Sequence, residues 1–111
     1  MEIHYTAEFK RNLRHLMKKY PTIRSDLEPL LLNLQSGEIC GDLVQHIGYQ
    51  VYKVRLPNRD AKRGKSGGYR VIYYLQTNEH IILVTIYSKI EQGDINPQQI
   101  KRIIKTFDAS S

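Results

Sequence analysis

The sequence predicts an α+β fold, in which a small and mainly antiparallel sheet packs against an N-terminal helical hairpin and a C-terminal helix. Apolar residues recur at helical spacing near both ends of the chain, whereas residues 50–88 contain runs that alternate with a period of two. The length of 111 residues suits one hydrophobic core. We therefore expect a single domain over residues 1–111, frayed at residues 108–111.

The N-terminal third predicts a strand followed by two helices. A short strand is expected over residues 2–5, with Thr6 as the N-cap of the helix that follows. Pro21 interrupts the helical pattern, because proline lacks the backbone donor that a helix interior needs. Ser25 and Glu28 have the spacing of a capping box, so the second helix is expected to begin near Ser25.

Three β-rich runs follow, at residues 51–56, 69–76 and 80–88. A short turn separates the last two runs, which predicts an antiparallel hairpin. The final run is apolar on both sides, so both of its faces should be covered. Asn96 as N-cap and Pro97 at the first helical position open the last helix. The predicted order is β-α-α-β-β-β-α.

The positive charge is concentrated in one stretch. The chain carries a formal net charge of +6, and residues 53–70 hold seven cations against one anion, so the remaining residues are balanced. Such a patch indicates a polyanionic partner: nucleic acid, a membrane surface or an acidic protein. A solvated charged loop without a partner is the alternative.

The composition points to the cytoplasm. No apolar run approaches the roughly 20 residues of a membrane span, and the N-terminus shows no signal-peptide pattern. Cys40 is the only cysteine, which rules out an intrachain disulfide and fits a reducing compartment.

Familiar metal and phosphate motifs do not fit the sequence. The four histidines stand far apart without the spacing of a zinc site, so we expect no metal ligands and no cofactor. The segment Gly64-Lys65-Ser66 resembles the end of a phosphate-binding P-loop, but Arg59 occupies the position that would need glycine.

The remaining candidates for a functional site are cationic side chains. Lys53 and Arg55 point to the same side of one predicted strand, Arg70 begins the next strand, and Lys89 ends the strand after that. On neighbouring strands these side chains would converge with a separation of about 5 Å, which is costly unless an anion occupies the site. Crowded cations can also turn a lysine into a base near neutral pH. Surface cations on a solvated sheet are the alternative.

A flexible basic loop offers further contacts for a phosphate backbone. Its cations are Arg59, Lys62, Arg63 and Lys65, and they stand before a pair of glycines that allows close approach of a partner.

Tyrosines are candidate stacking residues. Tyr73 and Tyr74 lie on opposite faces of one strand, so one can stack on a base while the other packs in the core. Tyr74 and Tyr87 are the two tyrosines that we expect to contact RNA.

Residues 52–56, 63–74 and 86–89 resemble the RelE/ParE toxin superfamily, and most closely its HigB-like branch. The most specific part is the block Gly-Lys-Ser-Gly-Gly-Tyr-Arg-Val-Ile-Tyr-Tyr. The similarity extends from the first helix to the last and includes the element order, which implies the RelE-like microbial RNase-type fold.

The resemblance implies the toxin of a type II toxin-antitoxin system that cleaves translated mRNA in the ribosomal A site. No metal is used in that reaction, because a 2′-hydroxyl attacks the adjacent phosphate while basic side chains transfer protons and stabilise charge. The implied partners are the ribosome, its mRNA and a cognate antitoxin, commonly a helix-turn-helix protein of the HigA-like kind that forms a hetero-oligomer with the toxin.

Each cation receives a role from its position in the family pattern. Lys53 and Arg55 match the paired basic residues, and Arg70 matches the phosphate-binding arginine. Lys53 would then be the base and Arg70 the clamp on the transition state. Arg55 and Lys65 would hold the RNA, and Lys89 would assist at the strand end.

One position departs from the family pattern. Related enzymes often carry a tyrosine shortly after the position of Lys89, where this chain has Asn96. Tyr87 is the side chain that could replace it. The rival reading within the superfamily is a ParE-like inhibitor of DNA gyrase, and a non-catalytic module that binds RNA or an antitoxin is a third class.

Overall fold

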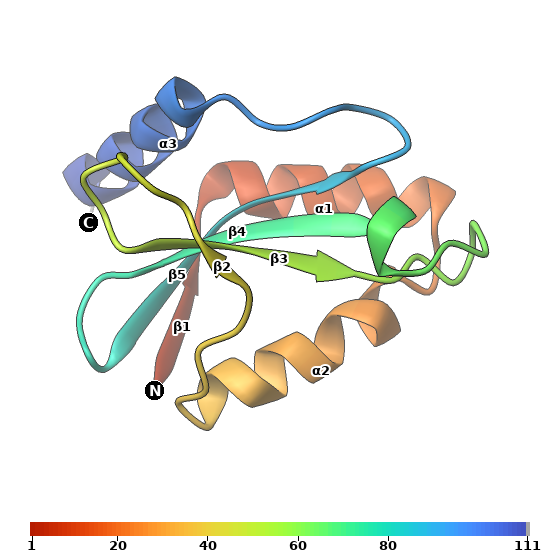
Figure 1. Ribbon diagram of the computed structural model, residues 1–111, viewed down its shortest axis with the longest axis horizontal. Coiled ribbons are helices and arrows are strands. Elements are labelled where there is room, and N and C mark those ends of the chain that lie inside the picture. Colours follow the sequence, from red (N-terminus) through yellow and green to blue (C-terminus); the bar gives the residue numbers. More distant parts are fainter. Residues whose placement is uncertain (111) are drawn as a thin grey trace.

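The computed structural model describes residues 1–110 as a five-stranded sheet with three helices (Figure 1). In chain order the elements are β1 (Glu2–Tyr5), α1 (Ala7–Lys19), α2 (Ile23–Gln35), β2 (Asp42–Leu43), β3 (Val51–Leu56), the 3₁₀ turn η1 (Lys65–Gly67), β4 (Tyr69–Leu75), β5 (His80–Ser88) and α3 (Pro97–Ser110). The strand order is β1-β5-β4-β3-β2, with β1 parallel to β5 and every other pair antiparallel. The predicted α+β fold is confirmed.

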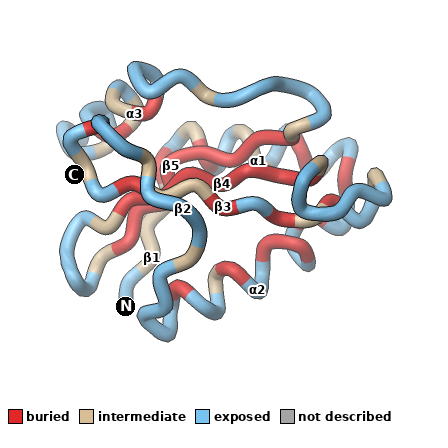
Figure 2. Tube along the Cα trace, in the orientation of Figure 1, coloured by how far each residue is buried: buried red, intermediate tan, exposed pale blue. Residues whose placement is uncertain are grey.

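One face of the sheet is covered by the helical hairpin. The buried apolar side chains of α1 and α2, which include Phe9, Leu16 and Leu34, pack against alternate residues of β3, β4 and β5. Phe9 and Leu34 are fully buried, so this face supplies the larger hydrophobic core. Figure 2 shows the strands mostly buried, while the connecting loops are exposed.

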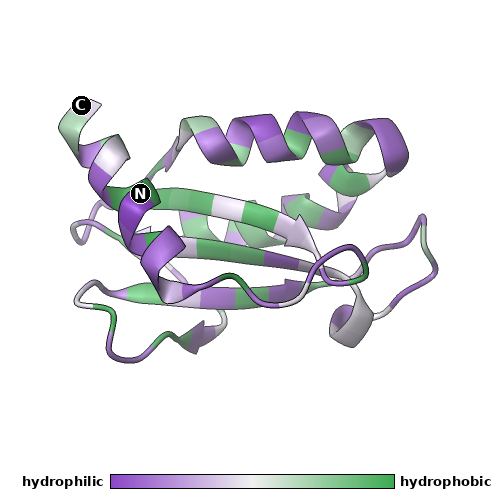
Figure 3. Cartoon of the chain, turned by 90° about the horizontal axis from the view of Figure 1, so that it is seen from above, coloured by the Kyte–Doolittle hydropathy of each residue, from purple (hydrophilic) through white to green (hydrophobic). Residues whose placement is uncertain are grey.

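The opposite face is covered in part by α3. Ile100 and Ile104 pack on Ile72, Ile82 and Val84 of the two middle strands, and this second cluster is also dry. The final strand is therefore buried on both faces, as its apolar sequence predicted. In Figure 3 the strands are largely hydrophobic, whereas helices and loops hold most of the hydrophilic residues.

The N-caps of the first and last helices are confirmed, and that of the second is not. Thr6 accepts a hydrogen bond from the backbone N–H of Phe9, and the Asn96 side chain accepts one from Gln98. However, α2 begins at Ile23, two residues before the predicted Ser25. Thr22 precedes it without a side-chain cap.

The start of α2 is held from outside the helix instead. Both the backbone N–H and the hydroxyl of Thr22 donate to Asp60 in the distant basic loop, at 2.8 and 2.7 Å. A capping box is a local pattern, and this long-range contact leaves no trace in the spacing of nearby residues.

The predicted fraying falls at residues 108–111, of which the structure describes residues 108–110 as part of helix α3. Helix α3 continues to Ser110, and Asp108 accepts a 2.7 Å hydrogen bond from the Tyr74 hydroxyl. Residue 111 lies outside the described residues. No helix within residues 1–110 is long and apolar enough to cross a membrane.

Candidate functional site

The register of the sheet places three of the predicted residues in one row. Arg55 of β3 is the partner of Arg70 in β4, and Arg70 is the partner of Tyr87 in β5. Lys53 lies two residues from Arg55 on the same side of β3. This is the face that carries α3, because the partner of Lys53 is Ile72 and Ile72 packs under that helix.

A carboxylate that we had not predicted joins the two lysines of the site. Asp94 Oδ1 lies 3.3 Å from Lys53 Nζ and 3.3 Å from Lys89 Nζ. The two ammonium groups are therefore at most twice that distance apart. The hydrogen bonds from Lys53 and Lys89 hold the pKa of the Asp94 carboxyl below its usual value.

Asp94 could have been noticed in the sequence. It is one of only two acidic residues between β5 and α3, and it follows Lys89 by five positions. Crowded cations on a sheet favour a nearby anion, and Asp94 is close to Lys89 in the sequence. Its position shows that an oxygen anion fits between Lys53 and Lys89.

Arg70 is buried, at 5% exposure, and its hydrogen bonds hold the basic loop against the sheet. Its guanidinium donates to the carbonyl oxygens of Lys65 at 2.8 Å, Ser66 at 2.7 Å and Tyr69 at 3.2 Å. Among residues 1–110 no carboxylate lies within ion-pair distance of it. The charge of Arg70 is therefore solvated by carbonyl dipoles alone, which leaves its field available to an anionic ligand.

Arg55 is the exposed member of the row. Its side chain forms no hydrogen bond or ion pair with any described residue. Unlike Arg70, it can turn toward a ligand without giving up a contact within the protein. A planar guanidinium of this kind binds phosphate with two parallel hydrogen bonds.

Gly68 sets the position of the loop relative to the sheet. A β-carbon at this residue would stand 1.9 Å from the carbonyl oxygen of Leu56, so only glycine allows the two backbones to come this close. The Gly68 carbonyl also accepts a hydrogen bond from the Lys89 N–H. The loop, the end of β3 and the end of β5 therefore meet at one point.

The four cations of the basic loop divide into two kinds. Arg59 pairs with Asp26 of α2, with 3.1 Å between Arg59 Nε and Asp26 Oδ1, and the Asp26 side chain is fully buried. Lys62, Arg63 and Lys65 are exposed and form no ion pair with any described residue. The predicted phosphate contacts are therefore geometrically open for these three residues, whereas Arg59 also anchors the loop to α2.

The tyrosines lie deeper than a stacking role would need. Tyr74 is 3% exposed and lies in the cluster under α3, with its hydroxyl bonded to Asp108. Burial raises its pKa, and the hydrogen bond to Asp108 adds to that shift. Tyr73 is fully buried on the other face. Neither ring is accessible to a base, because Tyr74 packs in the cluster under α3 and Tyr73 in the cluster under α1 and α2.

Tyr87 is also buried, at 4% exposure, but it stands beside the cations. Burial raises the pKa of its hydroxyl, and the nearby backbone of Ile95 opposes that shift. Arg70 and Asp94 both act electrostatically on this hydroxyl. A neutral phenol held next to an anion site is a potential proton donor.

Two of the four histidines are not far apart in space. His4 in β1 and His80 at the start of β5 approach to 3.0 Å between their ring nitrogens. The sequence showed no spacing for such a contact because the two residues are 76 positions apart. Parallel pairing of β1 with β5 brings them together.

The site therefore presents two lysines on one carboxylate, an exposed arginine, a buried arginine and a buried phenol at one end of the sheet. A sequence model of one protein family matches almost the whole chain. Its description is the RelE toxin of the RelE/RelB toxin-antitoxin system, and the match covers residues 1–109.

Proposed function

Because the chain belongs to the RelE toxin family, we propose that it is an endoribonuclease that cleaves translated mRNA in the ribosomal A site. The family match makes it a toxin whose natural partner is an antitoxin. Ribosome dependence, the place of cleavage and a HigA-like antitoxin of the helix-turn-helix kind are parts of the proposal, as is its assignment to the HigB-like branch.

One observation carries the proposal. Asp94 occupies a position in which an oxygen anion is held by Lys53 and Lys89 at 3.3 Å each. Arg55, which forms no hydrogen bond or ion pair with a described residue, lies two residues from Lys53 on the same side of β3, and Arg70 is its partner in β4. Binding of RNA would displace Asp94 from the two lysines, and charge-assisted hydrogen bonds to phosphate would replace its contacts.

The reaction that fits these groups is a transfer within the RNA chain. The 2′-oxygen forms a bond to the adjacent phosphorus, and the bond from phosphorus to the 5′-oxygen of the next nucleotide breaks. The products are a 2′,3′-cyclic phosphate and a free 5′-hydroxyl. The attacking 2′-hydroxyl loses a proton, and the leaving 5′-oxygen gains one. No metal is required for this exchange when cations stabilise the charge on the phosphate.

The residues divide these tasks according to where they lie. Once Lys53 is released from Asp94 and has lost its own proton to solvent, its neutral amine takes the proton of the 2′-hydroxyl. Arg55 and Lys89 bind the oxygens of the scissile phosphate, with Arg70 as the cation beneath them. Tyr87 protonates the leaving oxygen with its neutral hydroxyl, which requires that displacement of Asp94 also uncovers this buried group. Asn96 cannot fill this role.

The exposed loop cations have a separate task in the proposal. Lys62, Arg63 and Lys65 stand outside the row and contact neighbouring phosphates, which gives affinity without selecting a sequence. Codon selection then depends on the ribosome, which presents the mRNA to the site.

The test is a bacterial cell-free translation reaction with mRNA 5′ ends mapped by primer extension. We expect cuts within translated codons, and none when ribosomes are omitted. Lys53→Ala and Arg55→Ala should abolish the cuts. Lys10 is an exposed residue of α1, and Lys10→Ala is the matched control: it also removes one positive charge but should leave the cuts unchanged. Arg70→Lys is preferable to Arg70→Ala, because the alanine would also release the loop carbonyls.

Two outcomes would overturn the proposal. Cleavage that persists in Lys53→Ala and Arg55→Ala would show that another site cuts the RNA. Intact mRNA together with inhibited supercoiling by DNA gyrase would instead favour the ParE-like reading.

A further inference from the structure

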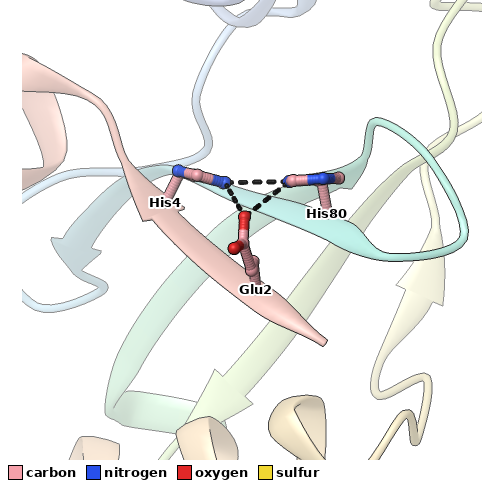
Figure 4. Close-up of side chains that lie close together, drawn as sticks. All are labelled: Glu2, His4 and His80. Atoms are coloured by element: carbon pink, nitrogen blue, oxygen red, sulfur yellow. Dashed lines mark hydrogen bonds and ion pairs between the residues drawn. The ribbon is translucent and has the colours of Figure 1, made fainter.

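A cluster of metal-ligating side chains lies at the edge of the sheet formed by β1, away from the cations. Figure 4 shows Glu2, His4 and His80 pointing toward one another. Glu2 Oε2 lies 3.4 Å from His4 Nε2 and 3.1 Å from His80 Nδ1, and the two nitrogens are 3.0 Å apart. Three potential ligand atoms thus form a small triangle.

The sheet itself assembles this triangle. Glu2 and His4 are two residues apart on β1, so their side chains lie on the same side of the strand. The parallel register places His80 of β5 opposite Glu2. Two ligands from one strand and a third from its neighbour are therefore fixed in relative position by backbone hydrogen bonds.

Hydrogen bonding within the cluster does not satisfy all three contacts at once. Each contact needs one proton between its two atoms, and only the two ring nitrogens can carry one. If both nitrogens donate to Glu2, two N–H groups face each other across 3.0 Å. If only one nitrogen carries a proton, at least one contact has none. A single cation among the three atoms, with both nitrogens unprotonated, satisfies the whole triangle.

We propose that Glu2, His4 and His80 bind a transition-metal dication of the zinc class. Ligand atoms around tetrahedral zinc, with bonds of about 2.0–2.1 Å, stand about 3.3 Å apart, which the three observed separations approximate. Two imidazole nitrogens and one carboxylate oxygen select Zn²⁺ or its neighbours over Mg²⁺ and Ca²⁺, which prefer oxygen ligands. Water fills the fourth position.

Only a small adjustment brings the histidines into ligating orientation. The two rings lie almost in one plane, at 18° to each other, with their nitrogens facing. A metal to the Glu2 side of the line between the nitrogens needs each ring to turn about its Cβ–Cγ bond. That torsion is soft in histidine. The side chains of His4 and His80 are 40% and 35% exposed, so both have room to turn.

The metal would act as a clamp on the N-terminal strand, independently of any nuclease activity. His80 opens β5 and Lys89 follows its last residue, so the two sites are separated by about 30 Å of strand. Strand β1 has four residues and only one neighbour in the sheet. A dication shared by β1 and β5 therefore stabilises a short strand at the edge of the sheet.

The test measures binding of Zn²⁺ and Co²⁺ to the purified full chain without a histidine tag. We expect one Zn²⁺ per chain by calorimetry and an intense visible absorption from four-coordinate Co²⁺ that Zn²⁺ abolishes. His4→Ala and His80→Ala should each weaken binding at least tenfold, about the effect of losing one metal contact. His15→Ala and His46→Ala are the matched controls and should bind as the unaltered chain does.

Thermal unfolding gives a second measurement on the same proteins. At a hundredfold excess of Zn²⁺ over its dissociation constant, the melting temperature should rise by about 10 °C, and the rise should vanish in His80→Ala but not in His46→Ala. The side chains of the cluster are partly exposed, so the variants should fold, which circular dichroism without metal would verify. Absence of binding, or binding that survives both His4→Ala and His80→Ala, would overturn the proposal.

Discussion

The two faces of the sheet differ in composition and role, although the same strands form both. The face under α1 and α2 carries the larger apolar cluster, with few polar contacts within it. The opposite face is apolar only where α3 covers it, and beyond that helix it carries Lys53, Arg55 and the buried Arg70. Alternation along a strand assigns each residue to one face, so β3 and β4 contribute to the core and to the site at once.

This difference shows which part of the molecule holds the fold and which part is free for chemistry. Residues of the hairpin face are dry, and their burial supplies stability. On the other face, like charges gather around a single carboxylate, and such crowding does not stabilise a protein unless an anion is bound. The comparison predicts that substitutions on one face will change stability and substitutions on the other will change activity.

The largest effect should come from the hairpin face. Phe9→Ala removes a fully buried ring from the larger core, and we expect the free energy of unfolding to fall by about 3–5 kcal/mol. Urea denaturation followed by circular dichroism measures it. Leu32→Ala on the outer side of α2, where the side chain is 58% exposed, should change stability by less than about 0.5 kcal/mol. Equal losses in both variants would contradict the assignment of the core.

Arg55→Ala should show the reverse behaviour. The residue is exposed and unpaired among the described residues, so stability should remain within about 0.5 kcal/mol. Cleavage of translated mRNA should fall about 100-fold or more, the usual loss when one donor to a charged transition state is removed. Primer extension over a time course gives the rate. A variant that is destabilised but still cleaves at the normal rate would contradict the assignment of stability to one face and activity to the other.

Tyr73→Phe tests a polar contact within the hairpin face. The hydroxyl donates to the Cys40 carbonyl at 2.6 Å and accepts from the Cys40 N–H at 2.8 Å, so its removal should cost about 1–3 kcal/mol. Burial raises the pKa of Tyr73 to about 12, so the folded state keeps a proton that the unfolded state loses near pH 10. Stability from this group is therefore complete below pH 10 and declines as the pH rises toward 12.

The loss of stability above pH 10 should be smaller in Tyr73→Phe than in the unaltered chain. Urea unfolding of both proteins at a series of pH values measures it. Tyr49 is partly buried against the other cluster and lies outside this core, so Tyr49→Phe is the matched control. An identical decline in Tyr73→Phe and the unaltered chain would mean that another group causes it.

The smallest effect should come from Asp94→Asn. Loss of the carboxylate frees Lys53 and Lys89, so a non-cleavable 2′-O-methyl RNA should bind about fivefold more tightly, the equivalent of one exposed charge contact. Fluorescence anisotropy at fixed salt measures this affinity. Since the pKa of Asp94 is lowered, the carboxylate stays charged until the pH falls below 3.8, and the two proteins should converge only there. Weaker binding by Asp94→Asn would show that the carboxylate positions the lysines for RNA.

The sequence was sufficient for features that depend on near neighbours. Thr6 as an N-cap, Asn96 as another and the side on which Lys53 and Arg55 lie all follow from local spacing, and the structure agrees. Convergence of Lys53 and Lys89 was also predicted from the strands that carry them, and they share one carboxylate.

Features that depend on distant partners could not be read in the same way. Thr22 is capped through Asp60, Arg70 binds carbonyls of a loop, and Tyr74 lies beneath α3. Alternation states which face a side chain occupies but not whether a helix covers that face. The same limit applies to Asp94: its position five residues after Lys89 marks it as a nearby anion, but does not show that the segment after β5 turns back over the sheet.

The parallel pairing of β1 with β5 has a consequence for the order of folding. Residues 2–5 join residues 80–83, and Thr6 donates its N–H to Leu83. Residues 2–5 can therefore enter the sheet only after residues 80–83 have been synthesised. Contacts of such sequence separation slow folding, because a long loop must close before they form. A nascent chain interrupted before β5 has no place for strand β1, so the complete sheet can form only after β5 has been made.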